Sequence, residues 1–201
     1  KLPDANPRAI ANVLHNHAAA LTRAERYADA EAAHLESLAL RRRLFTDPHT
    51  NIATGLHQLG VTKAAQKQYA QAARYFNEAR AQYVILVGAD DENVLIEDLA
   101  LARLEADQGR FDVAIELWQP LLERHRKLHG NAHEETAICA VELAEALQHT
   151  GQNAPAQALI DPAIAVLEQA HPDGHSVLAA ALRVQLALQQ DRGEPDCTLA
   201  E

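Results

Sequence analysis

Apolar residues recur along this chain at steps of three and four, which is the spacing of the buried face of a helix. Between residues 94 and 104 the apolar positions include Val94, Leu95, Leu99, Leu101, Ala102 and Leu104. The pattern stops at residues 108–110, where Gly109 lies, and resumes after Asp112. Because glycine readily takes the left-handed conformation that ends a helix, this stretch predicts two helices joined by a tight turn.

The same alternation of apolar steps and interruptions extends over the whole chain and predicts an all-α fold. The predicted helices span residues 7–22, 26–45, 49–65, 69–87, 92–107, 112–129, 134–149, 154–170 and 176–191. They form four pairs and one extra helix. Before the third helix, Asp47 and Pro48 predict a cap followed by proline at the first helical position.

A period of 42 residues relates the pairs to one another. An aromatic residue repeats at this interval as Tyr27, Tyr69 and Phe111, and an alanine follows three residues later as Ala30, Ala72 and Ala114, with Ala156 in the next period. Two further registers of the same interval are Gly109, Gly151 and Gly193, and His49, Asp91, His133 and His175. Several registers that share one period without insertions indicate a repeat protein.

One helix pair cannot bury its own apolar face, so repeats of this kind stack into a solenoid. We therefore expect a single solenoid domain over residues 1–201, with about four and a half helix pairs. Its repeats would span approximately residues 7–48, 49–90, 91–132 and 133–174, with a partial repeat at 175–201. The chain begins at Lys1 rather than at Met and stops at the edge of a fifth repeat, so we expect a fragment of a longer protein.

The registers also predict how the helices pack. The recurring alanines, of which Ala72, Ala114 and Ala156 are examples, should lie where the two helices of a pair approach closely. Gly109 and Gly151 should have positive φ just beyond a helix end. Trp118 shares its register with three other residues and is predicted to be core rather than a platform for a ligand; the three are His34, Phe76 and Ile160.

These repeats resemble the tetratricopeptide repeat (TPR), in the 42-residue subtype typical of kinesin light chain and of many bacterial signalling proteins. The resemblance rests on DQGRFDVA at residues 107–114, KQYAQA at 67–72, RYADA at 26–30, and the turns TDPH at 46–49 and AHPDG at 170–174. It implies a right-handed α-α superhelical solenoid. It also implies an inner groove, lined by the first helix of each pair, that binds an extended or helical peptide.

The resemblance places a set of candidate peptide-binding residues on this groove. They are Asn12, His15, Asn16 and Arg23 in the first pair, Thr54, His57 and Gln58 in the second, Leu99 and Arg103 in the third, and Glu142 and Glu145 in the fourth. Family members often have an asparagine at the position of Asn16, where it hydrogen-bonds the peptide backbone. The matching residues here are Gln58, Ala100, Glu142 and Val184, so the amide persists only into the second repeat.

The net charge of the chain limits the classes of molecule that it is expected to bind. The formal net charge is −10, of which residues 1–100 contribute −1 (12 acidic, 11 basic) and residues 101–201 contribute −9 (16 acidic, 7 basic). Such a chain is a poor ligand for nucleic acid or for anionic membrane surfaces, and no apolar run is long enough for membrane insertion. We expect a protein or peptide partner with a polar or acidic part near the first two repeats and a basic part near the fourth.

Chemical motifs are scarce. The sequence has no phosphate-binding glycine loop, no nucleophile elbow and no zinc-protease motif, so we expect neither an enzyme nor a cofactor. His125, His129 and His133 are spaced by four residues and suggest a metal site, but repeat-turn packing is the preferred explanation and we predict no metal. The two cysteines, Cys139 and Cys197, are expected to be a buried thiol and a tail thiol.

The preferred functional hypothesis is a protein-protein interaction module that holds a segment of a partner in its concave groove. The alternative is a regulatory or sensor region of a multidomain bacterial signalling enzyme, such as a protein kinase, with the catalytic domain in the same chain. Either protein would be cytoplasmic, because the chain opens with no signal-peptide pattern and has no disulfide framework.

Overall fold

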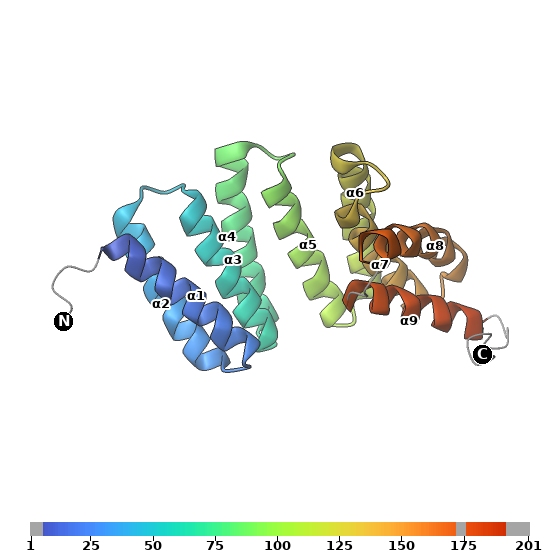
Figure 1. Cartoon of the computed structure of the whole chain (residues 1–201), viewed down its shortest axis with the longest axis horizontal. Coiled ribbons are helices and arrows are strands. Elements are labelled where there is room, and N and C mark those ends of the chain that lie inside the picture. The colour runs from blue at the N-terminus through green and yellow to red at the C-terminus, as the bar shows by residue number, and fades with distance from the viewer. Residues whose placement is uncertain (1–5, 172–175, 192–201) are drawn as a thin grey trace. The chain divides into compact units, whose positions relative to one another are not determined.

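The structure is a computed structural model that describes residues 6–171 and 176–191. In these residues the chain forms nine α-helices and no strand (Figure 1). The helices are α1 (Pro7–Arg23), α2 (Tyr27–Leu44), α3 (Thr50–Ala65), α4 (Tyr69–Val87), α5 (Glu92–Asp107), α6 (Phe111–His129), α7 (Glu134–His149), α8 (Asn153–Ala170) and α9 (Ser176–Asp191). Each predicted helix is present, with its ends displaced by one residue at most, so the predicted all-α fold is confirmed.

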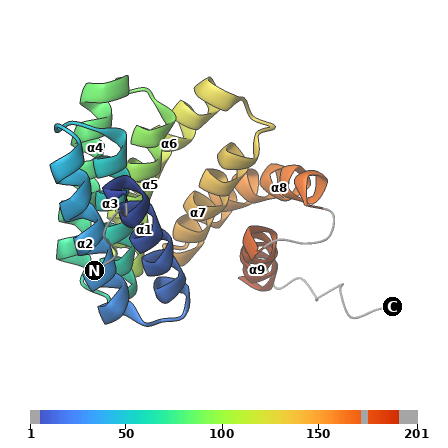
Figure 2. The ribbon, with the colours of Figure 1, turned by 60° about the vertical axis from the view of Figure 1, so that its left-hand side comes forward.

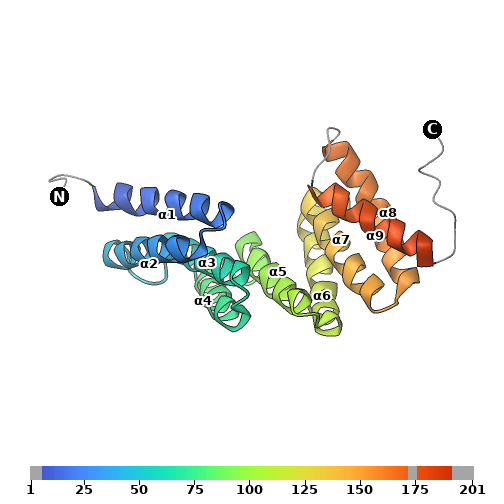
Figure 3. The ribbon, with the colours of Figure 1, turned by 90° about the horizontal axis from the view of Figure 1, so that it is seen from below.

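The chain divides into two compact units, Lys1–Leu104 and Glu105–Glu201, called unit 1 and unit 2 below. In unit 1, α1 packs against α2 and α3 against α4, and α2 also contacts α3 (Figures 1 and 2). In unit 2, α7 contacts α6 and α8, while α9 contacts both α7 and α8 (Figure 3). Within each unit, most of these contacts join helices that neighbour each other along the chain, as expected for stacked helix pairs.

The turn inside each pair has the same backbone geometry. Gly109 and Gly151 have φ of 73° and 74°, which confirms the predicted left-handed conformation. In unit 1 the same register is occupied by Glu25 and Lys67, which also have positive φ of 59° and 58°. In all four turns the next residue donates its N–H to the carbonyl five residues earlier, as in Gln152 N to Leu147 O at 2.8 Å. This bond closes the helix end in the Schellman pattern.

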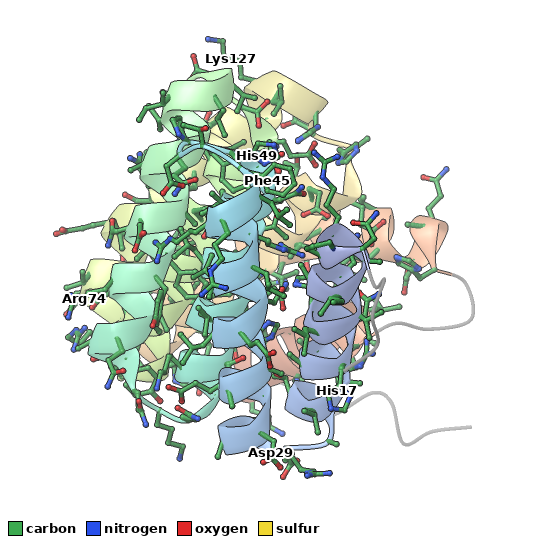
Figure 4. All side chains as sticks on the ribbon, turned by 90° about the vertical axis from the view of Figure 1, so that its left-hand side faces the viewer. His17, Asp29, Phe45, His49, Arg74 and Lys127 are labelled. Atoms are coloured by element: carbon green, nitrogen blue, oxygen red, sulfur yellow. The ribbon has the colours of Figure 1, made fainter. Side chains whose placement is uncertain are left out.

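The recurring histidines of the 42-residue register cap helices. The Nδ1 atoms of His49 and His133 accept from the backbone N–H two residues later, at 3.1 and 3.2 Å, and Asp91 Oδ1 does the same at 2.9 Å. The prediction that Asp47 caps α3 is wrong, because His49 supplies the acceptor and α3 begins at Thr50. The His49 ring also stacks on Phe45 at 4.0 Å, where the two labelled residues lie together in Figure 4. The register member His175 lies outside the described residues.

Small residues of the repeat pattern are buried in the helix packing. Ala30, Ala72, Ala114 and Ala156 are all fully buried, at 0% exposed. At Gly60 in α3, an added Cβ would lie 2.5 Å from the ring of Phe76 in α4. The shared register of Trp118 is buried throughout, and Trp118 itself is 3% exposed, so its prediction as a core residue is confirmed.

Candidate protein-binding face

The first helices of the first two pairs carry no acidic residue. Neither Pro7–Arg23 nor Thr50–Ala65 contains Asp or Glu, although the whole chain has 28 of them. On α1, the predicted groove residues Asn12, Asn16 and Arg23 are exposed. This part of unit 1 therefore presents amides and a cation to solvent, without a carboxylate on the same helices to repel an acidic ligand.

His57 on α3 is held by a buried carboxylate. Its Nδ1 lies 2.9 Å from Oε1 of Glu97 on α5, and the side chains are 21% and 1% exposed. Burial raises the pKa of the Glu97 carboxyl, and the hydrogen bond and charge of His57 oppose that rise. Because Nδ1 is engaged by Glu97, the ring nitrogen left to meet a partner is Nε2. The pairing fixes the orientation of this imidazole.

The second oxygen of Glu97 is a buried polar atom, Oε2, for which the described residues offer no hydrogen-bond partner. A buried carboxylate with one satisfied oxygen is destabilising, so a helix core would ordinarily exclude it. The corresponding residues of the other three repeats are Val13, Gly55 and Cys139. Glu97 is thus a departure from the repeat pattern, and its one hydrogen-bonded partner is a residue of the predicted groove.

Thr54 and Tyr83 form a second polar contact beside this pair. The Thr54 hydroxyl donates to the carbonyl of Thr50 at 2.9 Å, so the Tyr83 hydroxyl, 3.1 Å from Thr54 Oγ1, must donate to it. Burial raises the pKa of Tyr83. Arg41 is also buried, at 5% exposed, and its Nη1 donates to the carbonyl of Asn51 at 2.6 Å. Buried polar side chains of α2 and α4 therefore hydrogen-bond to α3.

The side chain of His15 on α1 is half-buried. Its ring is 5.7 Å from that of His34 on α2 in an edge-to-face arrangement. Burial lowers the pKa of His15, and the charge of Arg41 lowers it further. His34 is 1% exposed, and burial, with the charges of His15 and Arg41, lowers its pKa to about 4. Both imidazoles are therefore neutral at pH 7, and the cationic groups of this face are arginines.

The remaining predicted groove residues differ in exposure. Gln58 is half-buried and Arg103 is exposed, whereas Leu99 is 4% exposed and therefore belongs to the core and not to a ligand-facing surface. Within unit 2, Glu142 is half-buried and Glu145 is exposed on α7. The structure thus brings Thr54, His57 and Gln58 together on α3, and it gives the two glutamates a common helix in the other unit.

Sequence reasoning did not find three residues that shape this face: Arg41, Tyr83 and Glu97. Arg41 and Tyr83 occupy one register of the repeat, which continues as His125 and Leu167, and all four are buried. A charged residue in an otherwise apolar register was the available signal for Glu97. Its pairing with His57 could not be predicted, because the two residues are 40 positions apart and belong to different repeats.

Features that suggested other chemistry have structural roles. The rings of His129 and His133 stack at 4.4 Å, and His133 caps α7. Across the described residues, no group of three His, Cys, Asp or Glu side chains could hold a metal ion. Cys139 is buried, and Cys197 lies outside the described part. No described helix combines the length and apolar character needed to cross a membrane.

Paired helices of this length, related by one period and closed by one type of turn, define an α-helical repeat protein. A tetratricopeptide repeat model matches residues 9–83 and 95–169, which is more than half of the chain. The chain therefore belongs to the tetratricopeptide repeat family. No curated protein sequence matches it.

Several solved structures share the fold. A kinesin light chain from Podosopora anserina with nearly identical TPR-like repeats has a TM-score of 0.73 at 19% identity, over 94% of this chain and 90% of that one. BtubC (BKLC) from P. vanneervenii has a TM-score of 0.70 at 14% identity, covering 93% and 77%. The apo form of RapI gives 0.75 at 12% identity, covering 94% and 50%. These similarities identify the fold as the TPR solenoid, including the kinesin light chain-like subtype.

Proposed function

We propose that this chain is a protein-protein interaction module that binds a partner segment through the first helices of its repeats. The observation that carries the proposal is the polar face of unit 1, where acid-free α1 and α3 present amides beside an imidazole fixed by buried Glu97. Burying the Glu97 carboxylate lowers the stability of the fold, and its contact with His57 orients a partly exposed imidazole. We therefore expect this histidine to contact a ligand. Binding, without catalysis or a cofactor, is the activity that these groups support best.

The partner segment should be acidic where it contacts unit 1 and basic where it contacts α7. Arg23 and Arg103 are exposed cations on α1 and α5, whereas α7 presents Glu142 and Glu145. Complementary charge of this kind sets the orientation of a ligand and its rate of association more than its affinity. We therefore expect association to slow as salt concentration rises.

Backbone recognition falls to Asn16 and Gln58, which occupy one register on α1 and α3. A side-chain amide can donate to one peptide carbonyl and accept from one peptide N–H. Each such contact contributes about 0.5–1.5 kcal/mol net. Replacing both residues by alanine should therefore weaken binding by roughly 1–3 kcal/mol. Because Asn16 is exposed and Gln58 half-buried, the fold should persist.

The experiment begins by cross-linking partners to the protein and mapping the linked segment by mass spectrometry. A synthetic peptide of that segment is then titrated calorimetrically against wild type, the Asn16→Ala/Gln58→Ala double variant, and a control. Gln71→Ala is a matched control, because it removes an exposed amide from α4, a second helix of a pair. Loss of affinity in the double variant alone supports the proposal. Equal affinity in all three proteins, with intact circular dichroism, contradicts it.

A regulatory region of a cytoplasmic multidomain signalling enzyme would use the same face, with the acidic segment supplied by the same polypeptide. The cross-linking experiment distinguishes this case, because the linked peptide would then map to the parent chain rather than to a second protein.

A further inference from the structure

Unit 2 contains a cavity of about 460 Å³ between α6, α7 and α8. Its walls are mainly apolar and come from all three helices, with Leu122 on α6, Ala140 on α7 and Leu159 on α8. Arg126, together with Asn131, adds polar groups to the lining. Pockets of this volume with mostly apolar walls and a few polar groups are typical of small-molecule sites.

The 42-residue period gives this cavity a counterpart in unit 1. Positions two periods earlier lie at the junction of α2, α3 and α4, and several lining residues are identical there, such as Leu38 for Leu122 and Ala79 for Ala163. In unit 1, however, the space is a packed core. Leu38, Ile52, Leu56, Leu59 and Ala79 form one buried cluster, and Phe45 and Tyr75 pack against it.

Volume accounts for the difference between the two junctions. Three lining residues are smaller than their unit 1 counterparts: Thr136 against Ile52, Ala140 against Leu56, and Leu159 against Tyr75. Leu56 is 0% exposed, so the side chain that Ala140 lacks is one that fills the centre of the packed junction. Where these smaller side chains leave space open, the wall atoms lose dispersion contacts that a bound apolar ligand could restore.

The charged residues at the two junctions also differ. In unit 1, Arg42 on α2 pairs with Glu78 on α4 at 2.5 Å. The arginine is kept in unit 2 as Arg126, but Pro162 stands at the place of Glu78, and Asn131 at the place of Asp47. Arg126 pairs instead with Glu123, one turn earlier on its own helix, and the two side chains are 37% and 69% exposed. Such an exposed ion pair is weak, so the Arg126 guanidinium can bind another anion.

We propose that this cavity binds a small apolar carboxylic acid of about the length of a medium-chain fatty acid. The apolar part occupies the volume that Leu56 and Tyr75 fill in unit 1, between Leu122 and Leu159. The carboxylate takes the place of the missing Glu78 side chain and accepts hydrogen bonds from Arg126. This site lies on unit 2, and none of its lining residues is among the residues proposed to bind a protein partner.

Sodium octanoate is the probe, and the whole 201-residue chain is the protein. Calorimetric titration should give saturable binding with a Kd on the order of 1 mM, as expected for a ligand of this size. In methyl-labelled protein, the leucine resonances that shift should be those of Leu122 and Leu159. Octanamide, which keeps the chain and removes the charge, should bind about tenfold more weakly.

Four variants separate the apolar and the charged contributions. Ala140→Leu restores the packed volume of unit 1 and should abolish octanoate binding. Arg126→Gln should weaken binding about tenfold, because a charge-assisted hydrogen bond is lost. Pro162→Glu restores the internal partner of the arginine and should weaken binding to a similar extent. Arg42→Gln removes the corresponding arginine of unit 1 and should leave the affinity unchanged.

The proposal is overturned if octanoate shows no saturable binding, or if Ala140→Leu binds it as wild type does. Equal affinity for octanoate and octanamide, unaltered in Arg126→Gln, overturns the assignment of a carboxylate. If Ala140→Leu does not fold, Leu159→Tyr fills the same volume from α8 and is judged by the same criterion.

Discussion

The junction of α2, α3 and α4 in unit 1 and the junction of α6, α7 and α8 in unit 2 occupy the same place in the repeat, yet one is packed and the other is hollow. Both keep a leucine on the earlier helix and an alanine on the later one, at Leu38 and Ala79 and at Leu122 and Ala163. Similar backbones therefore do not guarantee similar interiors. The contrast depends on a few side chains, above all Leu56 against Ala140.

The same contrast appears in charge. Unit 1 pairs Arg42 with Glu78 across two helices, whereas unit 2 keeps the arginine and replaces the glutamate by Pro162. A repeat fold requires its register residues to form helices and to leave room for close approach. The fold does not require particular side chains in the remaining space between repeats. The residues that line this space can therefore change, and a ligand-binding site can arise there.

The largest expected change in stability comes from removing a buried side chain from the packed junction of unit 1. Leu56→Ala removes a side chain that is 0% exposed and should cost about 2–5 kcal/mol of unfolding free energy, from lost burial and the cavity left behind. Urea unfolding followed by circular dichroism measures the loss. Ile10→Val, at a position 37% exposed on α1, is the control and should change little. A loss below about 1 kcal/mol would mean that the junction collapses on itself or was never tightly packed.

Acid should destabilise unit 1 through His34, whose register in unit 2 is occupied by Trp118 and Ile160. Burial lowers the pKa of His34 to about 4, from the ordinary histidine value of 6.5. The unfolded chain therefore binds the proton more readily, so this contribution to stability is complete above pH 6.5 and declines as the pH falls toward 4. The loss should reach roughly 2–4 kcal/mol.

Denaturant unfolding at a series of pH values tests this sign and range. His34→Phe, which copies the aromatic residue of the second repeat, should flatten the dependence between pH 6.5 and 4. His17→Phe changes an exposed imidazole of α1, labelled in Figure 4, and should leave the dependence in place. A His34→Phe profile identical to wild type would assign the acid sensitivity to other groups.

The same substitution at two alanines of unit 2 should have opposite effects. Ala114 is 0% exposed and does not line the cavity, so Ala114→Leu should cost roughly 1–3 kcal/mol by overpacking. Ala140 borders the cavity, so Ala140→Leu should instead stabilise by about 0.5–2 kcal/mol. The single tryptophan, Trp118, lies in unit 2 and reports its unfolding by fluorescence. Destabilisation of similar size at both sites would contradict the contrast between packed and open alanines.

The smallest expected effect concerns the turns. Unit 2 has glycine at the positive-φ register, whereas unit 1 has Glu25 and Lys67 there. Lys67→Gly should stabilise by up to about 1 kcal/mol, because a residue with a Cβ is strained in this conformation. Gly109→Val should cost about 1–2 kcal/mol for the converse reason. Thermal unfolding of both variants measures the pair, and a Lys67→Gly protein that melts lower than wild type would show that the side chain contributes more than the strain.

Local sequence determined the helices, because helical hydrogen bonds join residues four apart and the turns use residues three to five apart. The 42-residue period, the positive φ of Gly109 and Gly151, and the burial of Trp118 were therefore predictable from spacing alone. The cap of α3 was missed because Asp47 and His49 are both plausible acceptors. Which of them bonds depends on how the loop packs.

Contacts between repeats were decided by the tertiary structure. Leu99 belonged to the groove by family position, yet it is buried, and His57 is oriented by Glu97, 40 residues away. The cavity lined by Ala140 likewise depends on whether neighbouring side chains are large enough to fill the space that a small residue leaves. Periodicity fixes which face of a helix turns inward. The volumes and charges that meet there come from helices distant in sequence, so only their packing decides whether the result is a core, an oriented histidine or a pocket.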